Sequence, residues 1–157
     1  MGVPRKGVMS PRPAWLLQRS RRSLGGFRGP PRLSESFPAV PESVRLVRNA
    51  LVDVAESAGA TSETVEAVRV ASSEAATNVV VHAYDGDPGD IDVTAGVNAP
   101  EDGMWVVVAD GGHGLDFGTQ SPGLGLGFVW MAWFSEGLAL GPSRAGGLEV
   151  RLRFLLR

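Results

Sequence analysis

Three short segments of this sequence carry side chains and backbone groups that could hold a phosphorylated ligand. Residues 74–78 read Glu-Ala-Ala-Thr-Asn, residues 110–114 read Asp-Gly-Gly-His-Gly, and residues 123–127 read Gly-Leu-Gly-Leu-Gly. Carboxylate and amide oxygens are hard ligands of the kind that Mg²⁺ prefers, and glycine-rich backbone can present N–H groups to an anion. In this order, the segments predict a nucleotide site with a metal side, a base side and a phosphate side.

The first segment places an acid and an amide one helical turn apart. At about 100° per residue, Glu74 and Asn78 lie about 40° apart around a helix, on the flank of its apolar stripe. In such a position Asn78 could ligate Mg²⁺, while Glu74 could orient a water or a hydroxyl as a general base. An exposed polar pair on an amphipathic helix is the alternative for this segment taken alone.

The second segment follows an apolar run that predicts a buried strand. Asp110 ends this run, and a carboxylate there could accept a hydrogen bond from an adenine amino group. A glycine next to such an aspartate would let a base approach the backbone, because it lacks a side chain. An ordinary strand-to-turn Asp-Gly pair is the alternative.

The third segment opens a predicted helix. Gly123, Gly125 and Gly127 would expose backbone N–H groups where the helix dipole also favours an anion. A flexible turn is the alternative. The segment does not match a dinucleotide fingerprint, because it lies late in the chain and lacks the G-x-G-x-x-G spacing after a first strand.

Hydrophobic periodicity indicates the elements that must position these segments. Helices are expected from Pro41 to about Ala58, from Thr61 or Ser62 to about Tyr84, and over residues 124–135. Strands are expected over residues 33–37, 91–97, 104–109, 138–140 and 148–156. The order β-α-α-β-β-α-β-β predicts an α+β fold, a two-layer α/β sandwich with a mixed sheet and its helices on one face.

Composition excludes several ways of handling phosphate or metal. The chain has 157 residues and no cysteine, which rules out disulfides and thiolate metal sites. Lys6 is the only lysine, so the chain has neither a Walker A loop nor the strand lysine of ordinary protein kinases. The apolar run 128–134 is too short to span a membrane. We expect Trp105, Trp130 and Trp133 to be core or partner-facing residues.

Charge divides the chain into two regions. Residues 1–32 hold eight of the 15 Lys and Arg residues and no acid, whereas residues 33–157 hold the other seven and all 17 acids, a net charge of 7 − 17 = −10. We expect 1–32 to be a basic, Pro/Gly-rich disordered leader, or an over-long start with Met9 or a later residue as the true first residue. A nucleic-acid or membrane-surface role for this leader is the alternative. Residues 33–157 are the expected domain, which we predict to be cytoplasmic and to bind neither nucleic acid nor membrane directly.

The three segments resemble the N, G1 and G2 boxes of the histidine-kinase-like ATPase superfamily, the Bergerat fold. Ser-Glu-Ala-Ala-Thr-Asn-Val-Val-Val-His-Ala-Tyr, residues 73–84, looks most like the anti-sigma-factor serine/threonine kinases of bacteria. The resemblance covers about residues 33–157. It implies that the cofactors are ATP and Mg²⁺, and it implies a role for each of the residues named below. Asn78 would ligate the metal, Glu74 would be the catalytic base for a substrate serine, and Asp110 would bind the adenine amino group. The glycines implied around the base and phosphates are Gly112, Gly114, Gly123, Gly125 and Gly127.

The resemblance also implies partners and a regulatory cycle. Such proteins sequester a sigma factor and phosphorylate an anti-sigma-factor antagonist, and they are usually homodimers. This chain departs from the pattern at two places. The lid over residues 116–123 is short and has no basic residue, and Leu148 stands where a threonine commonly supports the base-reading aspartate. The alternative function is therefore a non-catalytic ATP-binding regulatory protein that acts by partner binding only.

Overall fold

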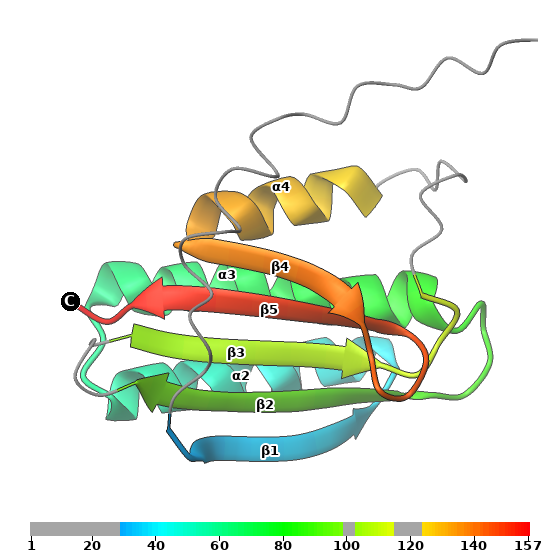
Figure 1. Ribbon diagram of the computed structural model, residues 1–157, viewed down its shortest axis with the longest axis horizontal. Helices are drawn as coiled ribbons and strands as arrows, with labels where there is room; N and C mark the ends of the chain where they lie inside the picture. Colours follow the sequence, from blue (N-terminus) through cyan, green and yellow to red (C-terminus); the bar gives the residue numbers. More distant parts are fainter. Residues whose placement is uncertain (1–28, 99–102, 115–123) are drawn as a thin grey trace, which may run out of the picture.

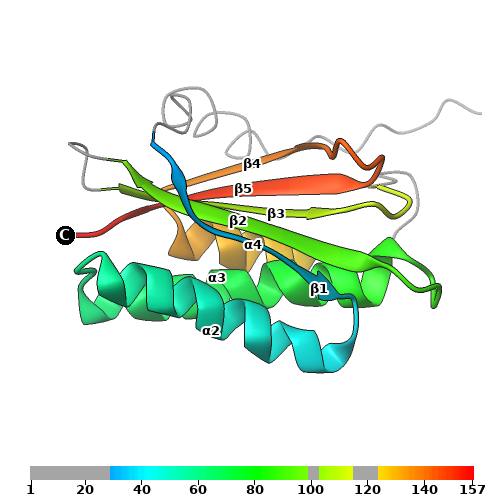
Figure 2. The ribbon, with the colours of Figure 1, turned by 90° about the horizontal axis from the view of Figure 1, so that it is seen from below.

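The computed structural model describes residues 29–98, 103–114 and 124–157. Its sheet has the strand order β1-β2-β3-β5-β4, with β1 at one edge and β4 at the other. Three α-helices lie side by side on one face of this sheet, in the order α2, α3, α4 (Figures 1 and 2). The predicted α+β two-layer sandwich is confirmed. The strands are β1 (Pro31–Pro38), β2 (Asp90–Asn98), β3 (Gly103–Asp110), β4 (Gly137–Pro142) and β5 (Leu148–Leu155).

The prediction of a mixed sheet was wrong, because every pair of neighbouring described strands is antiparallel. The connection from β3 through α4 to β4 does return the chain in the direction of β3. However, β5 forms a hairpin with β4 and pairs with β3, so it lies between the two strands that run the same way. Strands β3 and β4 thus run in the same direction, but they are not neighbours, and the sheet contains no parallel pair among the described strands.

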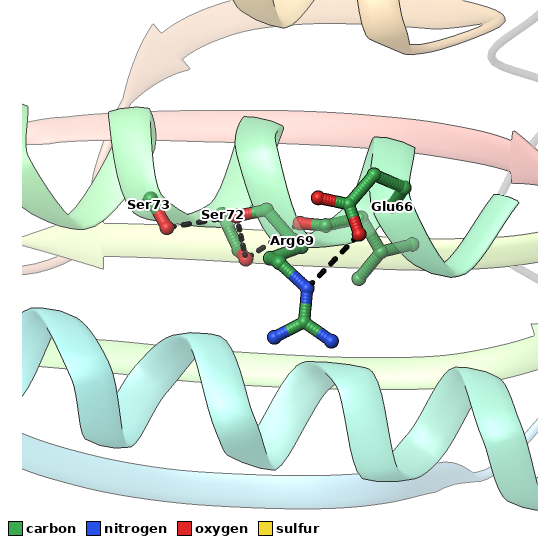
Figure 3. A network of polar contacts seen from close by, with 5 residues as sticks. Glu66, Arg69, Ser72 and Ser73 are labelled. Carbon is green, nitrogen blue, oxygen red and sulfur yellow. Dashed lines mark hydrogen bonds and ion pairs between the residues drawn. The ribbon is translucent and has the colours of Figure 1, made fainter. Parts of the chain in front are cut away.

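The first two helices follow their sequence signals closely. Helix α2 (Pro41–Ser57) starts with a proline, whose missing N–H costs nothing in the first turn. Helix α3 (Ser62–Asn78) is capped by Thr61, whose side chain accepts a hydrogen bond from the backbone N–H of Thr64 at 3.2 Å. In the middle of α3, Arg69 pairs with Glu66, and Ser73 donates to the carbonyl of Arg69 one turn back (Figure 3).

The end of the second helix differs from the expectation of one continuous α-helix to about Tyr84. After Asn78 the chain continues as a π-helix over Val79–Ala83. A π-turn inserts an extra residue, rotates the side chains that follow, and is often found beside functional sites. Here it carries the carbonyl of Ala83 to the loop after β3, where it accepts a hydrogen bond from the N–H of His113 at 2.9 Å.

The core lies between the sheet and the helices. Alternate residues of the three central strands point into it, and α2, α3 and the shorter α4 (Leu124–Phe134) cover them. The inward residues are Ile91, Val93, Ala95, Met104, Val106, Val108, Val150, Leu152 and Phe154, which pack against Val47, Leu51, Val68, Ala71, Ala75 and Met131. The helices α3 and α4 therefore lie along the strands, so that one end of this helix pair lies near each end of the strands (Figure 1).

Candidate nucleotide site

The carboxylate and the amide of the first segment lie together against the start of α4. A Cβ atom added to Gly127 would lie 3.1 Å from Asn78 Oδ1 and 3.2 Å from Glu74 Oε2. Both polar groups therefore converge on the first turn of a helix whose leading N–H groups have no partner within the helix. A side chain at position 127 would press on both of them, so the small residue brings α4 close to α3.

Asn78 is buried and its amide nitrogen is unsatisfied. The residue is 8% exposed, and Nδ2 has no hydrogen-bond partner among the residues that the structure describes. Buried polar atoms are nearly always paired, so an orphan in a native fold indicates a missing partner. Glu74, one turn earlier, is only half-buried. The pair combines an inward amide with a carboxylate that solvent or a substrate can reach.

The acid of the second segment is held by two backbone N–H groups. Asp110 is 3% exposed, and its Oδ1 accepts hydrogen bonds from Gly112 N at 2.9 Å and from Leu148 N at 3.3 Å. No described residue binds Oδ2, which leaves that oxygen to accept from a ligand. The backbone of Leu148 thus supports the aspartate although its side chain has no hydroxyl to offer.

Two contacts that the sequence reading missed hold this loop in place. Gly147, immediately before β5, lies close to the aspartate: an added Cβ would lie 2.0 Å from Asp110 Oδ1 and 2.7 Å from Gly112 N. The hydroxyl of Tyr84 accepts from Gly111 N at 2.9 Å and donates to Asp90 O at 2.7 Å. The glycine pair 146–147 was visible in the sequence, whereas no local pattern indicated this role for Tyr84.

The base side and the metal side face one hollow. Asn78, Asp110 and Gly114 all line it, together with His82 and Leu148. The hollow measures about 20 Å³, and Gly114 and Leu148 also line a neighbouring one of about 430 Å³. Because small-molecule sites usually measure about 300–1,000 Å³, a nucleotide would need the larger hollow as well as the smaller one.

The remaining glycines fall in three different places. Gly112 packs so tightly on the π-helix that an added Cβ would lie 1.9 Å from the carbonyl oxygen of Ala83. Gly125 sits in the first turn of α4 with open space where a side chain would be. Gly123 and the lid 116–123 lie outside the described residues. The structure therefore brings Asn78, Asp110 and Gly114 together at one hollow, and Glu74 and Asn78 together at Gly127.

The donor set suits ATP with Mg²⁺. No group of three or more His, Cys, Asp or Glu side chains in the described part of the chain could hold a metal by itself. Magnesium usually takes one or two protein oxygens and completes its shell with phosphate oxygens and water. A single Asn78 oxygen beside the first turn of a helix fits that mode better than a fully protein-built metal site.

The fold and this site define a nucleotide-binding domain of one known class. The chain belongs to the histidine kinase-like ATPase domain family, whose profile matches residues 37–154. This confirms the superfamily expected from the three boxes.

Individual relatives narrow the comparison. The chain is 44% identical over 90 residues to the serine-protein kinase RsbW of Bacillus velezensis (strain DSM 23117 / BGSC 10A6 / LMG 26770 / FZB42), which covers 57% of this chain and 55% of that relative. It is 42% identical over 89 residues to the serine-protein kinase RsbW of Bacillus subtilis (strain 168), covering 56% of this chain and 54% of that relative. The chain thus matches about half the length of these curated relatives. No helix in the described part of the chain is long and apolar enough to cross a membrane.

Proposed function

We propose that this chain is an ATP-dependent serine protein kinase that also acts as an anti-sigma factor. The observation that carries the proposal is the single hollow lined by Asn78 and Asp110, with Glu74 and Asn78 against Gly127 at the start of α4. The similarity to proteins named serine-protein kinase supports the same reaction class. The partners would be a sigma factor and a phosphorylatable antagonist, and the protein would be a cytoplasmic homodimer.

Each residue would have a distinct task in binding. Asp110 would accept a hydrogen bond from the adenine amino group on Oδ2, because two backbone N–H groups already fix Oδ1. Asn78 would offer Oδ1 to the metal and lose its unsatisfied state when the phosphates arrive. The first turn of α4, including Gly125 and Gly127, would present backbone N–H groups to the phosphates. Bound Mg²⁺ would neutralise negative charge on those phosphates.

Glu74 would serve as the general base. It would take the proton of a substrate serine hydroxyl as the serine oxygen bonds to the terminal phosphorus, and ADP would leave with the electrons of the broken P–O bond. Its carboxylate is half-buried and lies one turn from Asn78, so it can face both a protein substrate and the metal side. Positioning and charge stabilisation are the main contributions an enzyme makes to this reaction.

Phosphorylation would also control sigma binding. The chain would hold the sigma factor while the antagonist is phosphorylated, and it would phosphorylate the unmodified antagonist to release itself from that partner. A non-catalytic regulatory binder is the second candidate, and Leu148 favours it. A threonine there could add a side-chain hydroxyl to the support of Asp110, whereas this chain provides only the backbone N–H.

The test is a phosphotransfer assay with the purified chain, Mg·ATP and its cognate antagonist, read by mass spectrometry for phosphoserine. We expect transfer by the parent protein, loss of at least about 100-fold in rate for Glu74→Gln, and unchanged nucleotide affinity, since removing a general base costs about 10²–10⁴-fold. Glu56→Gln is the matched control, because Glu56 is an exposed acid on α2. Intact ATP and sigma binding without any phosphoserine would instead establish the non-catalytic binder.

A further inference from the structure

The far end of the α3–α4 pair carries a second, larger hollow that the nucleotide site does not use. We call it the end groove. It measures about 700 Å³ and lies between the start of α3, the end of α4 and the end of β5. Its charged and large apolar lining includes Glu63, Glu66, Trp133, Glu136, Leu155 and Arg157. The 17 residues of α3 place it about 25 Å from Asn78.

Large apolar side chains in the end groove are open to solvent. Trp133 is 78% exposed and Leu155 is 43% exposed. Burying a tryptophan removes about 150–250 Å² from water, so covering it stabilises a complex by a few kcal/mol. Tryptophans of this kind are typical anchors of protein interfaces. These exposed apolar side chains favour a protein segment over a small polar ligand.

The rim of the end groove is acidic. Glu63, Glu66 and Glu136 line the groove together with Trp133, and Arg157 is the basic residue in the same lining. Glu66 pairs with Arg69 at 3.2 Å, but the Glu66 side chain is 64% exposed and that of Arg69 40%, so solvent weakens the pair. A partner that carries arginine or lysine beside its apolar residues would complement both the acidic side chains and the exposed apolar side chains of the groove.

The walls of the end groove are fixed before any partner arrives. Thr64 Oγ1 donates to Leu155 O at 2.8 Å, and Thr61 N donates to Leu156 O at 3.0 Å, which ties the start of α3 to the end of β5. Glu136 N donates to Arg153 O at 2.8 Å, which ties the end of α4 to the same strand. Rigid walls lower the entropy that binding must cost.

We propose that the end groove docks a basic, apolar segment of a partner protein. A second copy of this chain is a poor occupant, because a two-fold contact would bring the same acidic rims together. Residues 33–157 carry a net charge of 7 − 17 = −10, which adds to that repulsion. The proposal does not depend on phosphoryl transfer, since the groove is lined by the start of α3 and the end of α4, whereas Asn78 and Gly127 lie at the other end of these helices.

The test uses fluorescein-labelled 14-residue peptides and the full chain, read by fluorescence anisotropy. A leucine/arginine amphipathic peptide is the probe, and leucine/glutamate and serine/arginine peptides of the same pattern are its controls. We expect the probe to bind at least tenfold more tightly than either control and to weaken as salt rises. Equal binding of the leucine/glutamate peptide would overturn the proposal.

Variants locate the binding surface. Trp133→Ala and the double change Glu63→Gln with Glu136→Gln should each weaken the probe at least tenfold, without altering nucleotide affinity. Leu46→Ala is the matched control, since Leu46 is an exposed apolar residue on α2, 47% exposed and outside the groove. Circular dichroism checks that the exposed substitutions leave the fold intact. Unchanged probe binding in both groove variants would refute the assignment.

Two other occupants would give distinct results that also overturn the proposal. Dimerisation that Trp133→Ala abolishes and Leu46→Ala retains, measured by analytical ultracentrifugation, would assign the groove to a second copy. A full-length variant with Arg19, Arg21 and Arg22 changed to Ser would bind the probe at least tenfold more tightly if the chain's own basic leader filled the groove. Equal dimerisation of the parent and Trp133→Ala proteins, and unchanged probe affinity in the arginine-to-serine variant, are the results expected for a partner protein.

Discussion

The two ends of the α3–α4 pair are built in opposite ways. At the nucleotide end, close approach depends on missing side chains: Cβ atoms at Gly112, Gly127 and Gly147 would all press on neighbouring polar groups. At the end groove, large side chains such as Trp133 and Leu155 project into solvent. The same two helices therefore present a site made mostly of backbone at one end and a side-chain surface at the other.

This difference indicates what each end can recognise. Backbone N–H groups and a fixed carboxylate discriminate small polar ligands, because their positions are set by hydrogen bonds within the fold. Exposed apolar side chains next to acidic ones instead suit a flexible protein segment, which can adapt its own side chains to the surface. Substitutions should accordingly act on the nucleotide end through sterics and on the end groove through lost contacts.

The largest expected effect is that of Gly147→Ala. The added Cβ would meet Asp110 Oδ1 at 2.0 Å and Asp110 O at 2.5 Å, so backbone must move. We expect a loss of about 3 kcal/mol in the free energy of unfolding and no measurable adenine binding, because overpacking a fixed contact is costly. Gly141→Ala is the control, since Gly141 has nothing within 4 Å of such a Cβ. Urea denaturation and calorimetry measure both effects, and equal stability of the two variants would contradict the steric account.

Asn78→Ala separates binding from stability. We expect Mg·ATP affinity to fall by at least about 100-fold, since the metal would lose its protein ligand. The free energy of unfolding should change by less than about 1 kcal/mol, because the substitution also removes a buried, unsatisfied Nδ2. Calorimetry with and without Mg²⁺ tests the affinity, with the exposed Asn49→Ala on α2 as control. Magnesium-dependent affinity that survives in Asn78→Ala would remove this residue from the site.

Local chemistry was predictable from the sequence, and contacts between distant segments were not. Helical periodicity correctly put Glu74 and Asn78 on one flank of a helix, because both belong to the same turn. Asp110 was placed in the same site by the types and order of the three segments and by the resemblance that they carry, not by a local pattern. Gly147 was missed because its role is a contact with Asp110 across the sheet, which no local pattern encodes. The π-turn after Asn78 was missed for the same reason, since its cost is offset by tertiary contacts such as the one to His113.

Tyr84→Phe and Thr64→Val each remove a hydroxyl that forms hydrogen bonds, one at each end of the α3–α4 pair. The Tyr84 hydroxyl donates to Asp90 O and accepts from Asp90 N and Gly111 N, whereas Thr64 Oγ1 donates to Leu155 O. We expect Tyr84→Phe to lower the free energy of unfolding by about 1.5 kcal/mol and to weaken ATP binding several-fold, because the loop at Gly111 loses its tether. Thr64→Val should cost about 1 kcal/mol and leave ATP affinity unchanged. Denaturation and nucleotide titration of both variants are the measurements, and equal loss of ATP affinity would mean that the two ends are not independent.

The smallest effects on stability are expected at the start of α4, where stability and function should not change together. Alanine is favoured over glycine within helices by about 0.8–1.0 kcal/mol. Gly125→Ala adds a Cβ in open space, so the protein should become more stable by up to about 1 kcal/mol. Gly127→Ala gains the same propensity, but its Cβ would lie 3.1 Å from Asn78 Oδ1 and 3.2 Å from Glu74 Oε2. Its net change in stability should therefore be close to zero, while phosphotransfer falls about tenfold as both polar groups shift, because active sites tolerate only small displacements. A Gly127→Ala protein as active as its parent would show that this contact does not position the reacting groups.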